Sequence, residues 1–170
     1  MFTPKALTLI AMVACHSPAT SNPAVPTAAA QGETTAANKR AVQATLEAWS
    51  QGDGGALQRL LTDDIEWTVT GHSAAAGTYH GRADLLDKVL TPFGARFKSS
   101  SDKFRPRTIH GIFGDGDTVV AHFDGAGVTN DGSPYNNSYV WLLTLRDGKV
   151  VRVTAFFDAI AFNELWKHAP

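Results

Sequence analysis

Two carboxylates and one imidazole in the C-terminal half of the chain are of the types that carry out acid–base chemistry. His122 and Asp124 stand two residues apart in the extended run Thr118–Val128, so strand alternation places both side chains on one face. Asp158 directly follows a second extended run, Lys149–Phe157. In a shared, water-poor hollow, desolvation and mutual repulsion favour one ionised and one protonated carboxyl group. One aspartate would then act as the base, while the other stays protonated or pairs with His122.

Such a hollow also needs a lining that holds a ligand and stabilises developing charge. We expect Trp67, Tyr139 and Phe156 to form its apolar wall. Tyr135, Asn137 or Tyr139 would donate hydrogen bonds to an oxyanion. These five residues are the predicted ligand-binding set. The reactions within reach are proton abstraction beside a carbonyl, dehydration or aldol-type cyclisation, and addition of water to an epoxide.

Each of the three acid–base residues also fits a structural role. Asp158 precedes a predicted helix, Ala159–Lys167, where aspartate is a preferred N-cap. Asp124 precedes Gly125 and could end a strand or mark a bulge. His122 fits equally well as a hydrogen-bonded histidine without a chemical task. The sequence therefore leaves catalytic and structural roles open for all three.

No metal site and no cofactor are predicted. His72, His80 and His110 lie on different expected elements, and their spacing is not that of zinc ligands.

A β-hairpin is the clearest local signal among the elements that must position these groups. Asp147-Gly148 separates the runs Tyr135–Leu145 and Lys149–Phe157, and Asp-Gly between such runs favours a tight hairpin turn. Alternation places Tyr135, Asn137, Tyr139, Trp141, Leu143 and Leu145 on one face of the first strand. Because both faces are apolar toward Leu143, we expect this strand to be central and covered on both sides.

Helical patterns come before most of the strands. Thr34 or Thr35 is predicted to cap a helix with Val42, Leu46 and Trp49 on its apolar side. Two further helices, the strand of Trp67 and a loop over His72–His80 follow, and hairpin-linked strands complete the chain. This order predicts an α+β fold with helices on one face of an antiparallel sheet.

The segments Gly52–Trp67, GDGGALQRLLTDDIEW, and Asp147–Asp158, DGKVVRVTAFFD, carry a family resemblance. Together with the order of elements, they resemble the SnoaL-like branch of the nuclear transport factor two superfamily. The resemblance implies a cone-shaped, curved sheet wrapped around a pocket that N-terminal helices close, and dimerisation through the sheet. Relatives include ketosteroid isomerase, scytalone dehydratase, polyketide cyclases, limonene epoxide hydrolase and non-catalytic binders, so the fold alone does not fix the activity.

The resemblance also bears on the acid–base residues. The segments His122–Asp124 and Phe156–Asp158 resemble the catalytic strands of limonene epoxide hydrolase, where two aspartates flanking an arginine activate water. Asp124 and Asp158 fall on the two carboxylates. His122 falls on the arginine, and a histidine cannot offer the permanently charged fork of a guanidinium.

The amino terminus is predicted to be a targeting segment. Residues 1–15 have a short apolar run that ends at Cys15, the only cysteine, and resemble a signal peptide with a bacterial lipobox. Residues 16–33 are rich in Pro, Ala, Ser and Thr and are expected to form a disordered tether to a domain over 34–170. The chain is therefore expected to be exported to the bacterial periplasm or cell envelope and lipid-anchored, or alternatively secreted.

Charge and composition narrow the class of partner. A formal net charge of -1 and the absence of a Lys/Arg cluster exclude a typical nucleic-acid-binding surface. A membrane is expected as a partner only through a lipid on Cys15. The predicted function is therefore binding of a small apolar or polycyclic molecule, with acid–base catalysis as one reading and a non-catalytic binding or dimerisation module as the other.

Overall fold

The computed structural model describes residues 27–99 and 101–169. The predicted signal segment, the lipidation site Cys15 and the part of the predicted tether before residue 27 lie outside these ranges. Within them, no helix is both long enough and apolar enough to cross a membrane.

The first helix, α1 (Ala28–Ser50), begins earlier than the sequence analysis expected. Thr27 is its N-cap and accepts a hydrogen bond from a backbone N–H of the first turn (3.3 Å). The predicted tether is therefore corrected for residues 28–33, which are helical. A segment without large apolar residues has little surface to bury, but alanine still has the highest helix propensity.

Four α-helices and one π-helical segment complete the helical part of the described chain. They are α2 (Ala56–Leu60), α3 (Arg82–Leu85), the π-helical η1 (Leu86–Leu90), α4 (Thr91–Ala95) and α5 (Ala159–Trp166). The segments α3, η1 and α4 follow one another without a break, where the sequence predicted a single helix.

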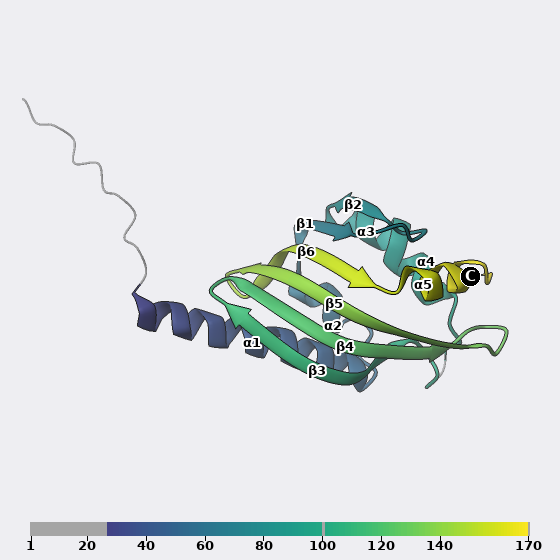
Figure 1. The fold of residues 1–170 in the computed structure, drawn as a ribbon, viewed down its shortest axis with the longest axis horizontal. Helices are drawn as coiled ribbons and strands as arrows, with labels where there is room; N and C mark the ends of the chain where they lie inside the picture. Colours follow the sequence, from purple (N-terminus) through teal and green to yellow (C-terminus); the bar gives the residue numbers. More distant parts are fainter. Residues whose placement is uncertain (1–26, 100, 170) are drawn as a thin grey trace, which may run out of the picture.

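Six strands form one curved sheet in the order β2-β1-β6-β5-β4-β3 (Figure 1). They are β1 (Leu61–Val69), β2 (Gly77–His80), β3 (Arg105–Asp115), β4 (Thr118–Val128), β5 (Pro134–Arg146) and β6 (Lys149–Phe157). All neighbours are antiparallel except β1 and β6, which are parallel. The parallel pair and β2, which lies in the predicted loop His72–His80, were not predicted.

The hairpin β5–β6 has the predicted turn. Asp147 has φ 52° and Gly148 has φ 72°, so both central residues are left-handed, as a type I′ turn requires. All six residues expected to share one face of β5, from Tyr135 to Leu145, are buried. The other face is not covered as predicted, because Leu142 is exposed within the described chain.

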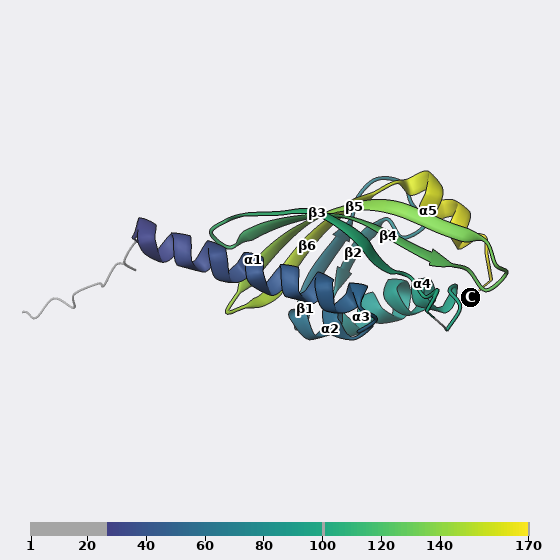
Figure 2. The same cartoon turned by 90° about the horizontal axis from the view of Figure 1, so that it is seen from below.

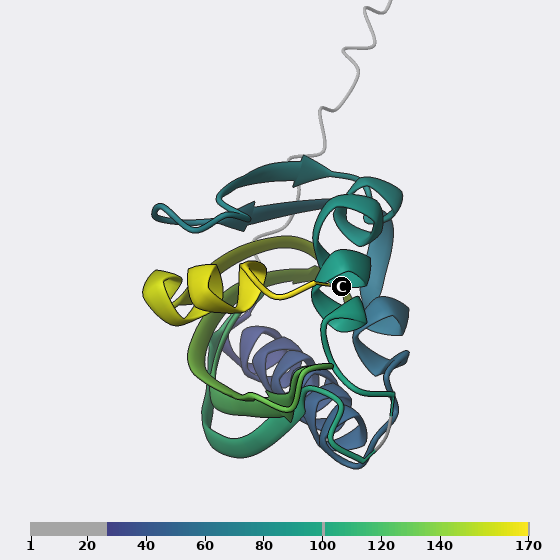
Figure 3. The same ribbon diagram turned by 90° about the vertical axis from the view of Figure 1, so that its right-hand side faces the viewer.

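The curved sheet wraps around the helices on its inner face (Figure 3). Helix α1 runs along β3, as Figure 2 shows from below. Two bonds fix its N-terminal half to the β3–β4 turn: Asn38 Nδ2 donates to Gly116 O (3.1 Å), and Gly116 N donates to Thr35 Oγ1 (2.8 Å). The curved sheet with N-terminal helices on its inner side confirms the predicted α+β class.

Candidate functional site

A cavity of about 610 Å³ lies between the inner face of the sheet and the helices. Its volume is in the range of pockets that hold small organic ligands. The sheet contributes residues from β1, β3, β5 and β6, and the helices close it with side chains that include Trp49 of α1, Leu57 of α2 and Phe93 of α4. The predicted arrangement of a sheet-lined pocket closed by helices is therefore present.

Aromatic rings dominate the wall of the cavity. Trp141 of β5 is the centre of the group, with Trp67 edge-on at 5.0 Å and Trp49 stacked at 6.3 Å between ring centroids. The aromatic side chains in the lining are Trp49, Trp67, Phe93, Phe104, Tyr139, Trp141, Phe157 and Phe162. The structure thus places Trp67 and Tyr139 in the cavity wall, as the sequence predicted.

Small residues beside Trp141 leave the space that the cavity occupies. In the sheet register, Trp141 lies between Ala121 of β4 and Ala155 of β6, and Ala155 in turn faces Val69 of β1. Two alanines beside a tryptophan fill less volume than a uniformly large row would. This row of side chains, which crosses four strands, therefore forms the floor of the cavity and does not fill it.

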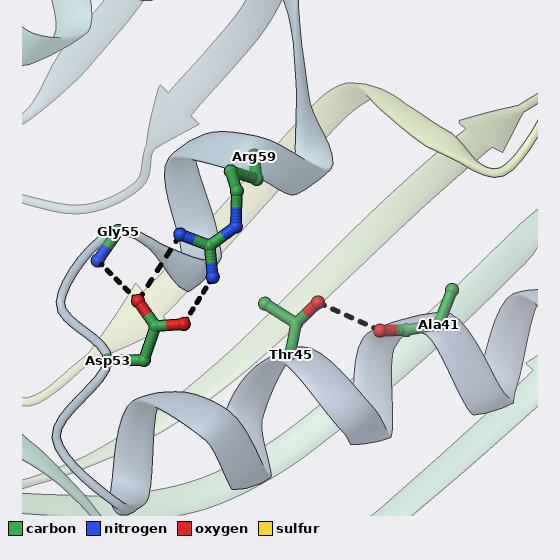
Figure 4. Close-up of polar contacts among 5 residues, drawn as sticks. All are labelled: Ala41, Thr45, Asp53, Gly55 and Arg59. Atoms are coloured by element: carbon green, nitrogen blue, oxygen red, sulfur yellow. Dashed lines mark hydrogen bonds and ion pairs between the residues drawn. The ribbon is translucent and has the colours of Figure 1, made fainter.

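The loop between α1 and α2 forms part of the rim and is held by Asp53 (Figure 4). Asp53 Oδ1 accepts a hydrogen bond from Gly55 N (3.1 Å), and its carboxylate pairs with the Arg59 guanidinium. A side chain at position 55 would come within 2.8 Å of Arg59 Nη1, so glycine leaves room for this pair. The neighbouring Gly52 and Gly54 line the cavity.

All formally charged residues in the described lining are cationic. They are Arg105, the first residue of β3, and Lys103, two residues before the strand, while no Asp, Glu or His is among the described lining residues. The Nε atom of Arg105 is buried and has no hydrogen-bond partner in the described chain. Because Nε is covered by protein, a ligand in the cavity would meet other atoms of the Arg105 side chain.

Behind the cavity wall, Tyr135 and Asn137 form a buried network instead of contacting the cavity. The hydroxyl groups of Tyr135 and Tyr139 are 3.0 Å apart, and Asn137 Nδ2 donates to Tyr135 Oη (2.9 Å). Burial raises the pKa of both tyrosines, most strongly that of Tyr139, so both keep their protons at neutral pH. The predicted ligand contact is thus corrected for Tyr135 and Asn137, which are not among the described lining residues of this cavity.

Asp158 takes the structural role that the sequence left open. Its side chain caps α5, accepting hydrogen bonds from Ile160 N (2.8 Å) and Ala161 N (3.4 Å). Its backbone is held by Asn137, whose Oδ1 accepts from Asp158 N and whose Nδ2 donates to Asp158 O, both at 3.0 Å. The Asp158 side chain is exposed and is not among the described lining residues.

His122 and Asp124 share a face of β4, as predicted, but it is the outer face of the sheet. The burial pattern of β4 alternates so that Val119, Ala121 and Phe123 point inward. The shared hollow predicted for positions 122, 124 and 158 is therefore wrong. Alternation identifies which side chains share a face, but it does not identify the face that points to the core.

Two inner glycines of β4 could have revealed the correct face. A Cβ at Gly125 would lie 2.3 Å from Phe104 Cζ, and one at Gly127 would lie 2.8 Å from Phe97 Cδ1. Glycines that alternate with Phe123 thus mark the side where other aromatic residues approach the backbone. Arg105 had no comparable signal, because an arginine at a strand end is usually solvated.

Phe156 was expected in the pocket but lies on the outer face, with 44% of its surface exposed. Leu142 on the neighbouring strand is 39% exposed. The adjacent residue Phe157 lines the cavity instead. The error has the same origin as that for His122, since a shift of one residue reverses the face.

Comparisons with known proteins agree with this architecture. A family model described as SnoaL-like domain matches residues 42–153. Bal32a, from a soil-derived mobile gene cassette, is 19% identical with a TM-score of 0.64, covering 78% of this chain and 98% of Bal32a. A protein described as a SnoaL-like polyketide cyclase from Jannaschia sp. CCS1 is 18% identical with a TM-score of 0.62, covering 81% of this chain and 96% of that one.

A further similar structure is that of TerC co-crystallised with polyporic acid. It is 26% identical with a TM-score of 0.59, over 77% of this chain and 98% of TerC. No match was found among curated proteins.

Proposed function

We propose that this chain, which belongs to the family of SnoaL-like domains, binds a small aromatic molecule that carries an acidic group. The family match confirms the resemblance seen in the sequence, and its relatives include a protein described as a polyketide cyclase. The observation that carries the proposal is the cavity lining, which is aromatic, has only cationic charged residues and, where described, contains no carboxylate or imidazole.

The apolar wall favours a ligand with ring systems. Trp67 and Trp141 meet edge to face at 5.0 Å, and Phe123 stacks on Tyr139 of the wall at 5.2 Å. Rings packed in this way are already held in place, so the protein loses little conformational entropy when a planar ligand binds. A flexible polar ligand would leave its hydrogen-bonding groups unpaired against such a wall.

The cationic residues favour an acidic group on that ligand. A carboxylate or an ionised enol would accept hydrogen bonds from the guanidinium of Arg105, which lines the cavity. A charge-assisted hydrogen bond of this kind contributes about 1.5–3 kcal/mol. TerC, which is 26% identical, was crystallised with polyporic acid, and an acid is the class of ligand that Arg105 and Lys103 would favour.

The cavity supports binding more strongly than the predicted acid–base catalysis. Asp124 and His122 lie on the other face of the sheet, and Asp158 caps α5. Tyr139, the ionisable group that remains in the wall beside the two cations, has a pKa raised well above its ordinary value by burial. It can donate a hydrogen bond, but it is a poor base at neutral pH.

Two fluorescent probes that differ by one charge test this proposal. The anionic 8-anilinonaphthalene-1-sulfonate and the neutral N-phenyl-1-naphthylamine share their ring system, and tryptophans in the cavity wall report binding by energy transfer. We expect Arg105→Met to weaken binding of the anionic probe by about 10-fold or more, as loss of one charge-assisted bond implies. Binding of the neutral probe should be unchanged.

Two variants serve as controls. Arg107→Met removes an exposed guanidinium from the same strand and should leave both affinities unchanged. Ala155→Leu fills the cavity floor and should weaken both probes. The proposal fails if neither probe binds, if Arg105→Met weakens both probes equally, or if Ala155→Leu has no effect. Enzymatic conversion of a bound acid would contradict the preference for binding over catalysis, but it would leave the proposed ligand class intact.

We further propose that a second copy of the chain covers the outer face of the sheet. Leu142 and Phe156 are both exposed there, on the adjacent strands β5 and β6, and Val140 lies beside Phe156 in the register. A row of exposed apolar side chains is a common feature of interaction surfaces. The family resemblance implies the same mode of dimerisation, and light scattering of the purified chain tests it.

A further inference from the structure

A cluster of possible metal ligands lies on the outer face of the sheet, on the opposite side from the cavity. His122 and Asp124 stand two apart on β4, and His110 comes from the neighbouring strand β3. The strand pairing passes from Ile109 opposite Phe123 to Gly111 opposite His122, so His110 is an extra residue in a bulge. A bulge changes the direction of a side chain, and here His110 lies close to His122 and Asp124.

The three side chains converge closely enough to hold one ion. His110 Nε2 lies 2.7 Å from Asp124 Oδ2, and the two imidazole rings stack with centroids 4.5 Å apart. One ligand atom from each of the three residues lies within 4.8 Å of the others. The ligands of a tetrahedral zinc ion are about 3.3 Å apart, as bonds of about 2.0 Å imply. Small rotations of partly exposed side chains would reach that geometry.

The carboxylate of Asp124 is held in an orientation that suits a metal ligand. Ser138 Oγ donates to Asp124 Oδ1 (2.6 Å), which orients the carboxylate and leaves Oδ2 facing the histidines. A hydrogen bond to the distal oxygen is a typical outer-shell contact of a metal-bound carboxylate.

We propose that His110, His122 and Asp124 form a binding site for a divalent transition-metal ion such as zinc. Two imidazole nitrogens and one carboxylate oxygen suit this class of ion better than calcium or magnesium, which prefer oxygen ligands. With three protein ligands, a fourth position stays open for water or for a group from a second molecule. Without metal, His110 Nε2 and Asp124 Oδ2 form a hydrogen bond with each other.

Calorimetric titration with zinc chloride tests the site. The full chain is used without a histidine tag and with Cys15→Ser throughout, so that the only thiol cannot contribute ligands. We expect one zinc per chain, or one per two chains if the ion is shared, with binding reversed by a chelator. His110→Ala, His122→Ala and Asp124→Asn should each weaken binding by at least about 10-fold.

His80→Ala is the matched control, because His80 is an exposed histidine near a carboxylate, with Nδ1 3.9 Å from Glu66 Oε2, and belongs to no such cluster of three in the described chain. It should bind zinc as the parent does. Cobalt should give the visible absorption of a four-coordinate ion in the parent and lose it in all three site variants. The proposal is overturned if the parent takes up no zinc, if the three variants retain it, or if His80→Ala loses it equally.

Discussion

Replacing Asn137 by alanine is expected to destabilise the protein by detaching the start of helix α5 from the sheet. Asn137 is buried on the inner face of β5 and makes three side-chain hydrogen bonds, two to the backbone of Asp158 and one to the hydroxyl of Tyr135. Each such bond contributes about 1 kcal/mol, and removing the side chain leaves the partner groups unpaired. The expected loss in the free energy of unfolding is therefore about 3 kcal/mol.

Urea unfolding followed by tryptophan fluorescence measures this loss. A lower midpoint at an unchanged denaturant slope would show that stability changed and that the compactness of the unfolded state did not. Asn136→Ala is the matched control, because Asn136 is the exposed neighbour on the opposite face, and its loss should cost less than about 0.5 kcal/mol. Asn137→Asp keeps the size of the side chain but turns a second acceptor toward Asp158 O, so it should be no more stable than Asn137→Ala.

A small effect of Asn137→Ala, below about 0.5 kcal/mol, would refute the reasoning, because three buried bonds cannot be lost at so little cost. A second outcome would return Asn137 to the ligand-binding role expected from the sequence. In that case the variant would keep its stability but lose affinity for both fluorescent probes.

Three further outcomes are expected. Asp158→Ala should cost about 1 kcal/mol through loss of the N-cap and leave probe affinity unchanged, as unfolding and fluorescence titrations will show. Bonds from Thr129 and other donors hold the pKa of Asp131 below its ordinary value of 3.8, so its stabilisation is present above that value and is lost as the pH falls further below it. Asp131→Asn should therefore destabilise at pH 7 and differ less from the parent in acid, measured by urea unfolding at several pH values. Leu142→Asp should shift the mass measured by light scattering from dimer to monomer, because Leu142 lies on the proposed contact face.

The local elements of this protein were largely predictable. The bounds of β4 and β6 match the predicted runs, and the turn at Asp147-Gly148 has the left-handed backbone that these two residues favour. The face shared by Tyr135 and Leu145 was also correct, because side chains alternate along a strand regardless of the rest of the fold. Helix α1 was found but placed too late, because its start depends on alanine propensity more than on burial.

The candidate site was predictable only in part. Trp67 and Tyr139 were expected as part of an apolar wall and lie in the lining of the cavity. His122, Asp124 and Phe156 were assigned to the wrong face, because alternation along a strand does not show which side faces the core. Arg105 was missed, because its unpaired nitrogen exists only once the segment before β3 has packed.

The sequence by itself determined most of the helices and strands, which side chains share a face and which family the chain resembles, because these follow from local periodicity and turn chemistry. Only the tertiary structure decided which face encloses the cavity and which residues from different strands meet. The meeting of His110 with His122 and Asp124 depends on a one-residue bulge in the pairing of β3 with β4. Register between strands is set by the packing of the whole sheet, so no spacing within one strand could reveal it.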